Sequence, residues 1–226
     1  MERRDFMTLG AVAVAGSVLN AGESTQNNSK PTHAEAYELK PLNFDPKSLK
    51  GLSEKIIMSH YNKNYGGAVK RGKIIEEKIA QLQSNANPFE LGALKREQMV
   101  AINSMILHEY YFDNLGASGK VSDTLTKALI ASFGSIEKWD DEFRKTALSL
   151  GGGSGWVFLV YNDRLKRVEN VWAWDHMHGL WDSKILLALD MYEHSYQVDF
   201  GANAKEYLNA FFANINWDVV NKRFEK

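Results

Sequence analysis

The chain of 226 residues has no cysteine, only four prolines, and almost equal numbers of basic and acidic side chains, 27 and 28. The absence of cysteine excludes disulfides, thiol catalysis, zinc fingers and iron–sulfur clusters, so any bound metal must use histidine and carboxylate ligands. The sequence has neither an excess of basic residues nor a long basic run, so it lacks the positive charge that is typical of proteins that bind nucleic acid or an anionic membrane surface. A charged substrate must therefore be attracted locally.

No apolar run is long enough to be a retained membrane helix, but residues 1–28 have the pattern of an export signal. Arg3 and Arg4 precede an apolar run at residues 9–19, well short of the ~20 residues that span a bilayer. The arginine pair, with Phe6 two residues after it, resembles a twin-arginine signal, and an ordinary secretory leader is the alternative. We expect an exported, periplasmic protein with no stable membrane insertion after the leader is removed. The cleavage site stays open.

Apolar residues recur at helical spacing through the first half of the chain. Residues 52–82 predict two helices or one kinked helix, interrupted at Gly66 and Gly67, and residues 93–112 predict a further helix. The 44% apolar content is sufficient for a sizeable core and excludes disorder, collagen and coiled coil. The prediction for residues 29–118 is a helical N-terminal domain built on a long helical hairpin.

The second half of the chain is mixed. Ser122 and Ser135 are typical helix caps, and Val- and Trp-rich runs flank a turn at Asn162. The expected elements are helices after the two serines, strands at 156–161, 166–174 and 185–189, and one amphipathic helix at 204–224. Residues 119–226 are thus predicted to form an α/β domain with a small three-stranded antiparallel sheet, and the fold class is α+β. No internal repeat is present.

Four residues could form a metal site. His60 and His108 occupy inward-facing positions of two predicted helices, whereas Asp190 and His194 follow a predicted buried strand. One histidine on a helix is more often a core or surface group, and an Asp-x-x-x-His spacing alone is weak evidence. Together, three imidazoles and one carboxylate form an N3O ligand set that suits Fe, Mn or Zn and leaves a position open to solvent.

In order and spacing, these residues resemble the iron/manganese superoxide dismutases. The matching segments span nearly all of residues 37–226; they are IMSHYNK at 57–63, NSMILHEYYF at 103–112, ASFGS at 131–135, GSGW at 153–156 and DMYEH at 190–194. The last segment corresponds to the family signature Asp-x-Trp-Glu-His, with Tyr192 in place of Trp.

The resemblance implies that His60, His108, Asp190 and His194 hold one Fe or Mn ion per subunit, with a solvent molecule as fifth ligand. It implies dismutation of superoxide to dioxygen and hydrogen peroxide. The choice between Fe and Mn stays open, because the ligand set accepts both.

The resemblance also implies roles for residues around the metal. In the family, a Gln or His at one of two positions hydrogen-bonds to the metal-bound solvent. Ser104 occupies the first position here and is too short to reach the solvent. His176, at the second position, is therefore predicted to make this contact, and His178 is the alternative. Trp156 and Tyr111 match aromatic residues that line the metal cavity.

Glu193 matches the family residue that crosses a homodimer interface to the partner's last histidine ligand. The resemblance therefore implies a homodimer whose metal sites lie close to the interface.

The sequence departs from the family at the gate for substrate and protons. Asn64 and Ala68 replace the gate His and Tyr, and Gln197 replaces the Tyr that meets that His from the other subunit. We expect Asn64 and Gln197 to hydrogen-bond across the interface, and Ala68 to leave a wider opening. With α-helical geometry Tyr65 lies about 140° round the axis from His60, so it is not expected to replace the lost phenol.

The sequence therefore leaves two functions open. The first is an exported superoxide dismutase in which proton delivery is slower or more pH-dependent. The alternative is an exported metal-binding relative with weak or lost dismutase activity, because the gate residues are Asn64 and Ala68. A metal-dependent peroxidase-like enzyme has no positive residue signal. The complete ligand set and His176 favour the first function.

Overall fold

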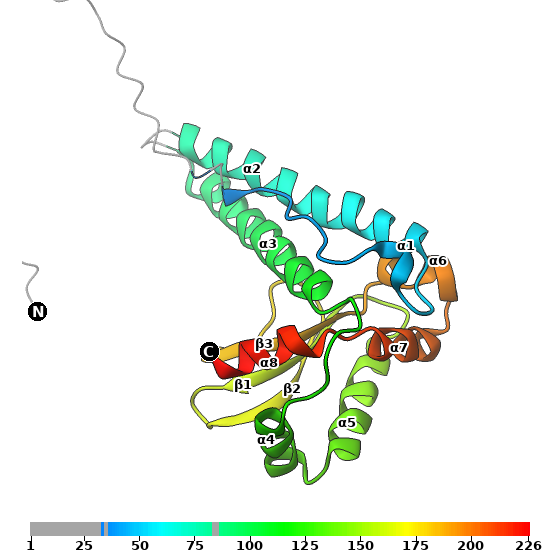
Figure 1. The fold of residues 1–226 in the computed structure, drawn as a ribbon. Helices are drawn as coiled ribbons and strands as arrows, with labels where there is room; N and C mark the ends of the chain where they lie inside the picture. Colours follow the sequence, from blue (N-terminus) through cyan, green and yellow to red (C-terminus); the bar gives the residue numbers. More distant parts are fainter. Residues whose placement is uncertain (1–32, 34–35, 83–85) are drawn as a thin grey trace, which may run out of the picture.

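The computed structural model describes residue 33, residues 36–82 and residues 86–226. The export signal expected at residues 1–28 lies outside the described residues. A long helical hairpin extends from a body in which helices surround a three-stranded sheet (Figure 1). This arrangement confirms the predicted α+β class. In the part of the chain that is described, no helix combines the length and hydrophobicity needed to cross a membrane.

The first arm of the hairpin is one continuous helical stretch. It comprises α1 (Glu54–Ser59), the π-helical turn η3 (His60–Tyr65) and α2 (Gly66–Gln81). The predicted interruption at Gly66 and Gly67 is therefore wrong, because both glycines continue the helix as the first residues of α2. The irregularity lies just before them, in the π turn.

The π turn changes which side chains share a face. Its hydrogen bonds join residues five apart, so Tyr65 takes a different direction relative to His60 than in an α-helix, and both residues are only 1% exposed. The α-helical geometry assumed for this segment is therefore wrong, whereas the expectation that Tyr65 does not replace the lost phenol stays a prediction. Ala68 is 8% exposed and belongs to the hydrophobic core, and the wider opening expected at this position stays a prediction.

The second arm, α3 (Pro88–Asp113), begins five residues before the predicted start at residue 93. Asn87 caps it, with its Oδ1 accepting from the backbone N–H of Phe89 at 2.8 Å. Pro88 occupies the first position, where its missing N–H costs nothing and its fixed φ suits a helix.

The sheet follows the predicted hairpin and third strand. Strands β1 (Trp156–Asn162), β2 (Arg167–Ala173) and β3 (Ser183–Asp190) are antiparallel, in the order β2-β1-β3. The register places Trp156 opposite Asp190, so the first residue of the central strand lies beside the carboxylate at the end of β3.

The remaining helices surround the sheet. The serines predicted as caps begin α4 (Asp123–Phe133) and α5 (Ile136–Leu148), each accepting a hydrogen bond from a first-turn backbone N–H. Short turns complete the fold: η2 (Pro46–Ser48), η4 (Glu193–Ser195) and α6 (Gln197–Phe200).

The single closing helix predicted at 204–224 is wrong. The structure has α7 (Ala204–Ala213) and α8 (Trp217–Glu225). Asn214 separates them because its buried side chain bonds to the backbone of Lys50 and Ala210, and Asn216 then caps α8.

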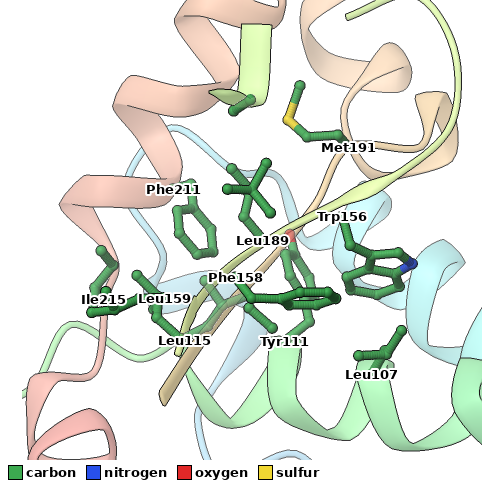
Figure 2. Packing of buried hydrophobic residues seen from close by; sticks show 14 of the residues in the cluster. Leu107, Tyr111, Leu115, Trp156, Phe158, Leu159, Leu189, Met191, Phe211 and Ile215 are labelled. Carbon is green, nitrogen blue, oxygen red and sulfur yellow. The ribbon is translucent and has the colours of Figure 1, made fainter. Parts of the chain in front are cut away.

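The hairpin and the sheet share one hydrophobic core. Figure 2 shows Leu107 and Tyr111 of α3 packed near Trp156 and Phe158 of β1, with Phe211 of α7 on another side of the cluster. The domain boundary between residues 118 and 119 stays a prediction.

Asn114, at the end of α3, joins three elements. Its buried Nδ2 donates to the carbonyl of Ala188 in β3 at 2.8 Å, and its Oδ1 accepts from Nη1 of Arg223 in α8 at 2.6 Å. Removing this side chain breaks both hydrogen bonds in a largely buried region, which is costly.

We therefore expect Asn114→Ala to lower the free energy of unfolding by about 2–4 kcal/mol. Asn209→Ala is the matched control, because Asn209 is exposed and bonds only to an arginine side chain. Urea unfolding measures both variants. Equal stability of the two would show that the Asn114 contacts do not hold these elements together.

Candidate metal centre

The four predicted ligands come together from four elements. His60 opens η3, His108 lies on α3, Asp190 ends β3 and His194 lies in η4. One possible ligand atom from each of these residues lies within 4.8 Å of the others. Three of the residues are buried, and the side chain of His194 is 26% exposed. The structure brings the residues together; their role as ligands stays a prediction.

The cluster is centred on one carboxylate oxygen. Oδ2 of Asp190 lies 3.1 Å from Nε2 of His60, 3.7 Å from Nε2 of His108 and 3.2 Å from Nε2 of His194. Oδ1 accepts from the backbone N–H of Tyr192 at 2.8 Å, which fixes the orientation of the carboxylate. The predicted ligand set is therefore three nitrogens gathered around one carboxylate oxygen.

His108 shows why this point suits a cation. Its Nδ1 lies 2.6 Å from the carbonyl oxygen of Ser104, which can only accept, so Nδ1 carries the proton and Nε2 presents a lone pair. Burial is the main reason that the pKa of His108 falls to about 3, so the ring is neutral at neutral pH. A buried lone pair thus faces the carboxylate of Asp190, an arrangement that a metal ion between them stabilises.

The pKa shifts of His60 and Asp190 are also consistent with a cation site. Burial lowers the pKa of His60, and the carboxylate of Asp190, 3.1 Å from its Nε2, opposes that shift. Burial alone would raise the pKa of Asp190, but His194 and His60 outweigh it and hold that pKa well below its usual range. Neutral imidazoles and an ionised carboxylate are the protonation states that metal binding requires.

Aromatic rings enclose the cluster. The ring centroids of Tyr111 and Phe112 lie 4.9 Å and 5.0 Å from that of His60, and Trp156 lies 5.4 Å from His108. Tyr111 and Trp156 are thus placed where the resemblance implies. Tyr207 was not predicted; its hydroxyl donates to the backbone carbonyl of Asp190 at 2.8 Å, and only its place on an amphipathic helix hinted at burial.

His176 lies beside the cluster, 6.1 Å from His108 between ring centroids, and stacks on Tyr192 at 4.8 Å. Its Nδ1 accepts from Nε1 of Trp156 at 3.0 Å, and because an indole only donates, the neutral ring carries its proton on Nε2. The alternative, His178, is exposed, with Nδ1 2.8 Å from a carboxylate oxygen of Asp175.

The residues predicted to meet a second subunit lie at or near the surface. Glu193 and Gln197 are exposed, and Asn64 is half-buried. Their predicted contacts involve another chain, so they stay predictions. Tyr65, which was not expected near the site, lies with its ring 6.2 Å from that of His108; only knowledge of the π turn would have revealed it.

Fold and site define an α+β protein with a buried cluster of three histidines and one aspartate of the kind that holds a single metal ion. Comparison with known proteins agrees: residues 121–223 match the family model for iron/manganese superoxide dismutases, C-terminal domain. "Superoxide dismutase [Fe]" of Cupriavidus metallidurans is 52% identical over 189 residues, covering 83% of this chain and 96% of that protein.

More distant relatives carry the names of either metal. "Superoxide dismutase [Fe]" of Aquifex pyrophilus is 33% identical over 84% of this chain and 92% of its own length. "Superoxide dismutase [Mn] 1" of Halobacterium salinarum is 31% identical over 84% of this chain and 96% of its own length. The chain belongs to the iron/manganese superoxide dismutase family.

The neutral histidines predict an acid-sensitive metal-free protein. His108 takes up a proton near pH 6.5 when unfolded but only near pH 3 when folded, so the unfolded state binds more protons between these values. Stability should therefore fall as the pH falls through this window, by up to about 1.4 kcal/mol per pH unit for each such histidine. His60 adds an effect of the same sign.

Urea unfolding of the chelator-treated protein between pH 7 and pH 4.5 measures this slope. His108→Gln should reduce the slope by about the contribution of one proton. An unchanged slope in that variant would contradict the burial of a neutral His108.

Proposed function

We propose that the protein is a superoxide dismutase in which His60, His108, Asp190 and His194 hold one Fe or Mn ion per chain. The observation that carries this proposal is the buried cluster itself, with its ligand atoms within 4.8 Å of one another. The 52% identity to a relative named "Superoxide dismutase [Fe]" supports it. The N3O donor set accepts either metal, and relatives are named for both.

The reaction converts two superoxide anions and two protons to dioxygen and hydrogen peroxide. A bound Fe or Mn ion would supply the one-electron redox chemistry that this reaction needs. The chain supplies the environment: the ionised Asp190 would offset part of the ion's positive charge, and the neutral ring of His108 keeps its Nε2 lone pair free for binding. The aromatic rings around them limit water and strengthen these electrostatic interactions.

His176 is the proposed catalytic residue beside the ligands. Trp156 holds it in the tautomer with a proton on Nε2, so the ring offers an N–H donor to a small molecule or solvent at the centre. Burial lowers the pKa of His176, which keeps the ring neutral and the tautomer defined at neutral pH. Through this donor the chain adjusts how easily the centre is reduced.

We expect His176→Ala to retain metal but to lower the rate of superoxide decay per bound ion by roughly 10–100-fold, with a shifted reduction potential. His178→Ala is the matched control on the same loop and should leave both quantities unchanged. Stopped-flow decay of superoxide and a redox titration of the loaded variants check this. An effect of His178→Ala equal to that of His176→Ala would contradict the choice of His176.

The active form is proposed to be a homodimer. Glu193 directly precedes His194, the most exposed of the four proposed ligands, and Val198 nearby is 50% exposed. A second subunit at this surface would cover the open side of the centre, with Glu193 directed to the partner's last histidine and Asn64 facing Gln197.

Light scattering during size-exclusion chromatography should therefore give the mass of a dimer. Glu193→Ala should weaken the dimer and speed metal loss together, whereas Glu206→Ala, an exposed carboxylate on α7, should change neither. A monomeric protein with full metal occupancy would contradict the proposed interface.

Export by the twin-arginine route is proposed from the sequence of the leader alone. The arginine pair is the essential element of such a signal, so replacing Arg3 and Arg4 by lysine should retain the protein in the cytoplasm of a bacterial host. An ordinary secretory leader needs only positive charge, and would tolerate this change. Cell fractionation distinguishes the two routes.

A further inference from the structure

Tyr65 is buried at the end of the π turn that begins with His60. Its hydroxyl donates to Oε1 of Glu109 at 3.1 Å and accepts from the backbone N–H of Lys40 at 3.0 Å. The ring lies nearly parallel to that of His108, with an interplanar angle of 14°. Both the hydroxyl and the ring of Tyr65 are therefore held in place.

Glu109, which accepts the hydrogen bond from Tyr65, lies next to a proposed metal ligand. It directly follows His108 on α3, and its other carboxylate oxygen pairs with Nζ of Lys40. The Glu109 side chain is 16% exposed, so its hydrogen bond from Tyr65 is largely shielded from water, where a charge-assisted bond is strong.

The Tyr65–Glu109 bond thus joins two helical segments at the points where they carry proposed ligands. One end lies a single π turn from His60, and the other lies one residue from His108. The imidazole rings of these two histidines are 4.9 Å apart. A change in the spacing of the two segments at this point moves their Nε2 atoms relative to Asp190.

We propose that Tyr65 and Glu109 are positioning residues that set the separation of His60 and His108, and with it the geometry and retention of the metal. This inference rests on the proposed metal site. The positioning role depends on the hydrogen bond between the two side chains and requires no change in their protonation. Tyr65 acts here through its bond to Glu109, and its hydroxyl also accepts from the backbone N–H of Lys40.

Tyr61 provides a matched control on the same turn. Its hydroxyl also bonds to the backbone of Lys40, donating to the carbonyl oxygen at 2.8 Å, and its ring lies 5.6 Å from that of Tyr65. Tyr61→Phe therefore removes the same chemical group and a bond to the same residue, but leaves the Tyr65–Glu109 bond intact.

The experiment measures release of Fe or Mn to a chelator and the visible absorption of the fully loaded, oxidised protein. We expect Tyr65→Phe to release metal roughly five- to tenfold faster than wild type, as loss of one largely buried hydrogen bond predicts, and to shift the visible band. Tyr61→Phe should match wild type in both. Urea unfolding of the metal-free variants separates this effect from a general loss of stability.

Two variants of Glu109 test the other end of the bond. Glu109→Gln keeps an acceptor for the phenol but loses the carboxylate charge and the ion pair to a lysine whose side chain is 68% exposed, so it should release metal more slowly than Tyr65→Phe does. Glu109→Ala should behave like Tyr65→Phe. These variants keep the test decisive if the phenylalanine variant folds poorly.

Equal metal release and equal spectra for Tyr65→Phe and Tyr61→Phe would overturn the positioning role and leave the proposed function intact. Failure of the wild-type protein to hold Fe or Mn would overturn both. The wild-type measurement therefore distinguishes the two failures.

Discussion

A single buried carboxylate is the constraint on which the rest of the structure depends. Asp190 is fully buried, and three imidazole nitrogens lie 3.1 Å, 3.2 Å and 3.7 Å from its Oδ2. Burying an ionised carboxylate among lone pairs costs several kcal/mol unless positive charge compensates it. The backbone bond to Oδ1 and the bonds from Ser195 and Tyr207 to the carbonyl of Asp190 hold it in that position nonetheless. A metal ion bound between these groups would supply the compensating positive charge.

The fold brings partners to this carboxylate from both halves of the chain. Sheet register sets Trp156 opposite Asp190, and the same indole determines the tautomer of His176. On the other side, the π turn directs His60 inward and brings Tyr65 beside His108. Residues next to the proposed ligands in space, such as Trp156 and Tyr65, thus orient the side chains around the site, which is how an open metal site keeps its geometry.

Much of this structure could be predicted from the sequence, for identifiable physical reasons. Ser122 and Ser135 are strong local cap signals, and the Val- and Trp-rich runs around Asn162 are typical of a hairpin, so these elements were predicted correctly. The approach of His60 and His108 to Asp190 followed from their positions on apolar faces and at the end of a strand.

The errors arose where tertiary contacts override local pattern. The π turn is not encoded in helical periodicity, so the α-helical phase misplaced Tyr65. The break at Asn214 depends on its bonds to Lys50, 164 residues away in sequence, which no local window contains. The role of Glu193 requires a second chain, and a single sequence gives only a resemblance for it.

The most direct test of the account is the rate of superoxide decay as a function of bound metal, measured on metal-free protein reloaded with Fe, Mn or Zn. The account predicts catalytic decay that rises in proportion to bound Fe or Mn, reaches its limit at one ion per chain, and is absent with Zn, which has no redox chemistry. Full occupancy by Fe and by Mn with decay at the background rate would contradict it, and would leave a metal-binding member of the family without dismutase activity.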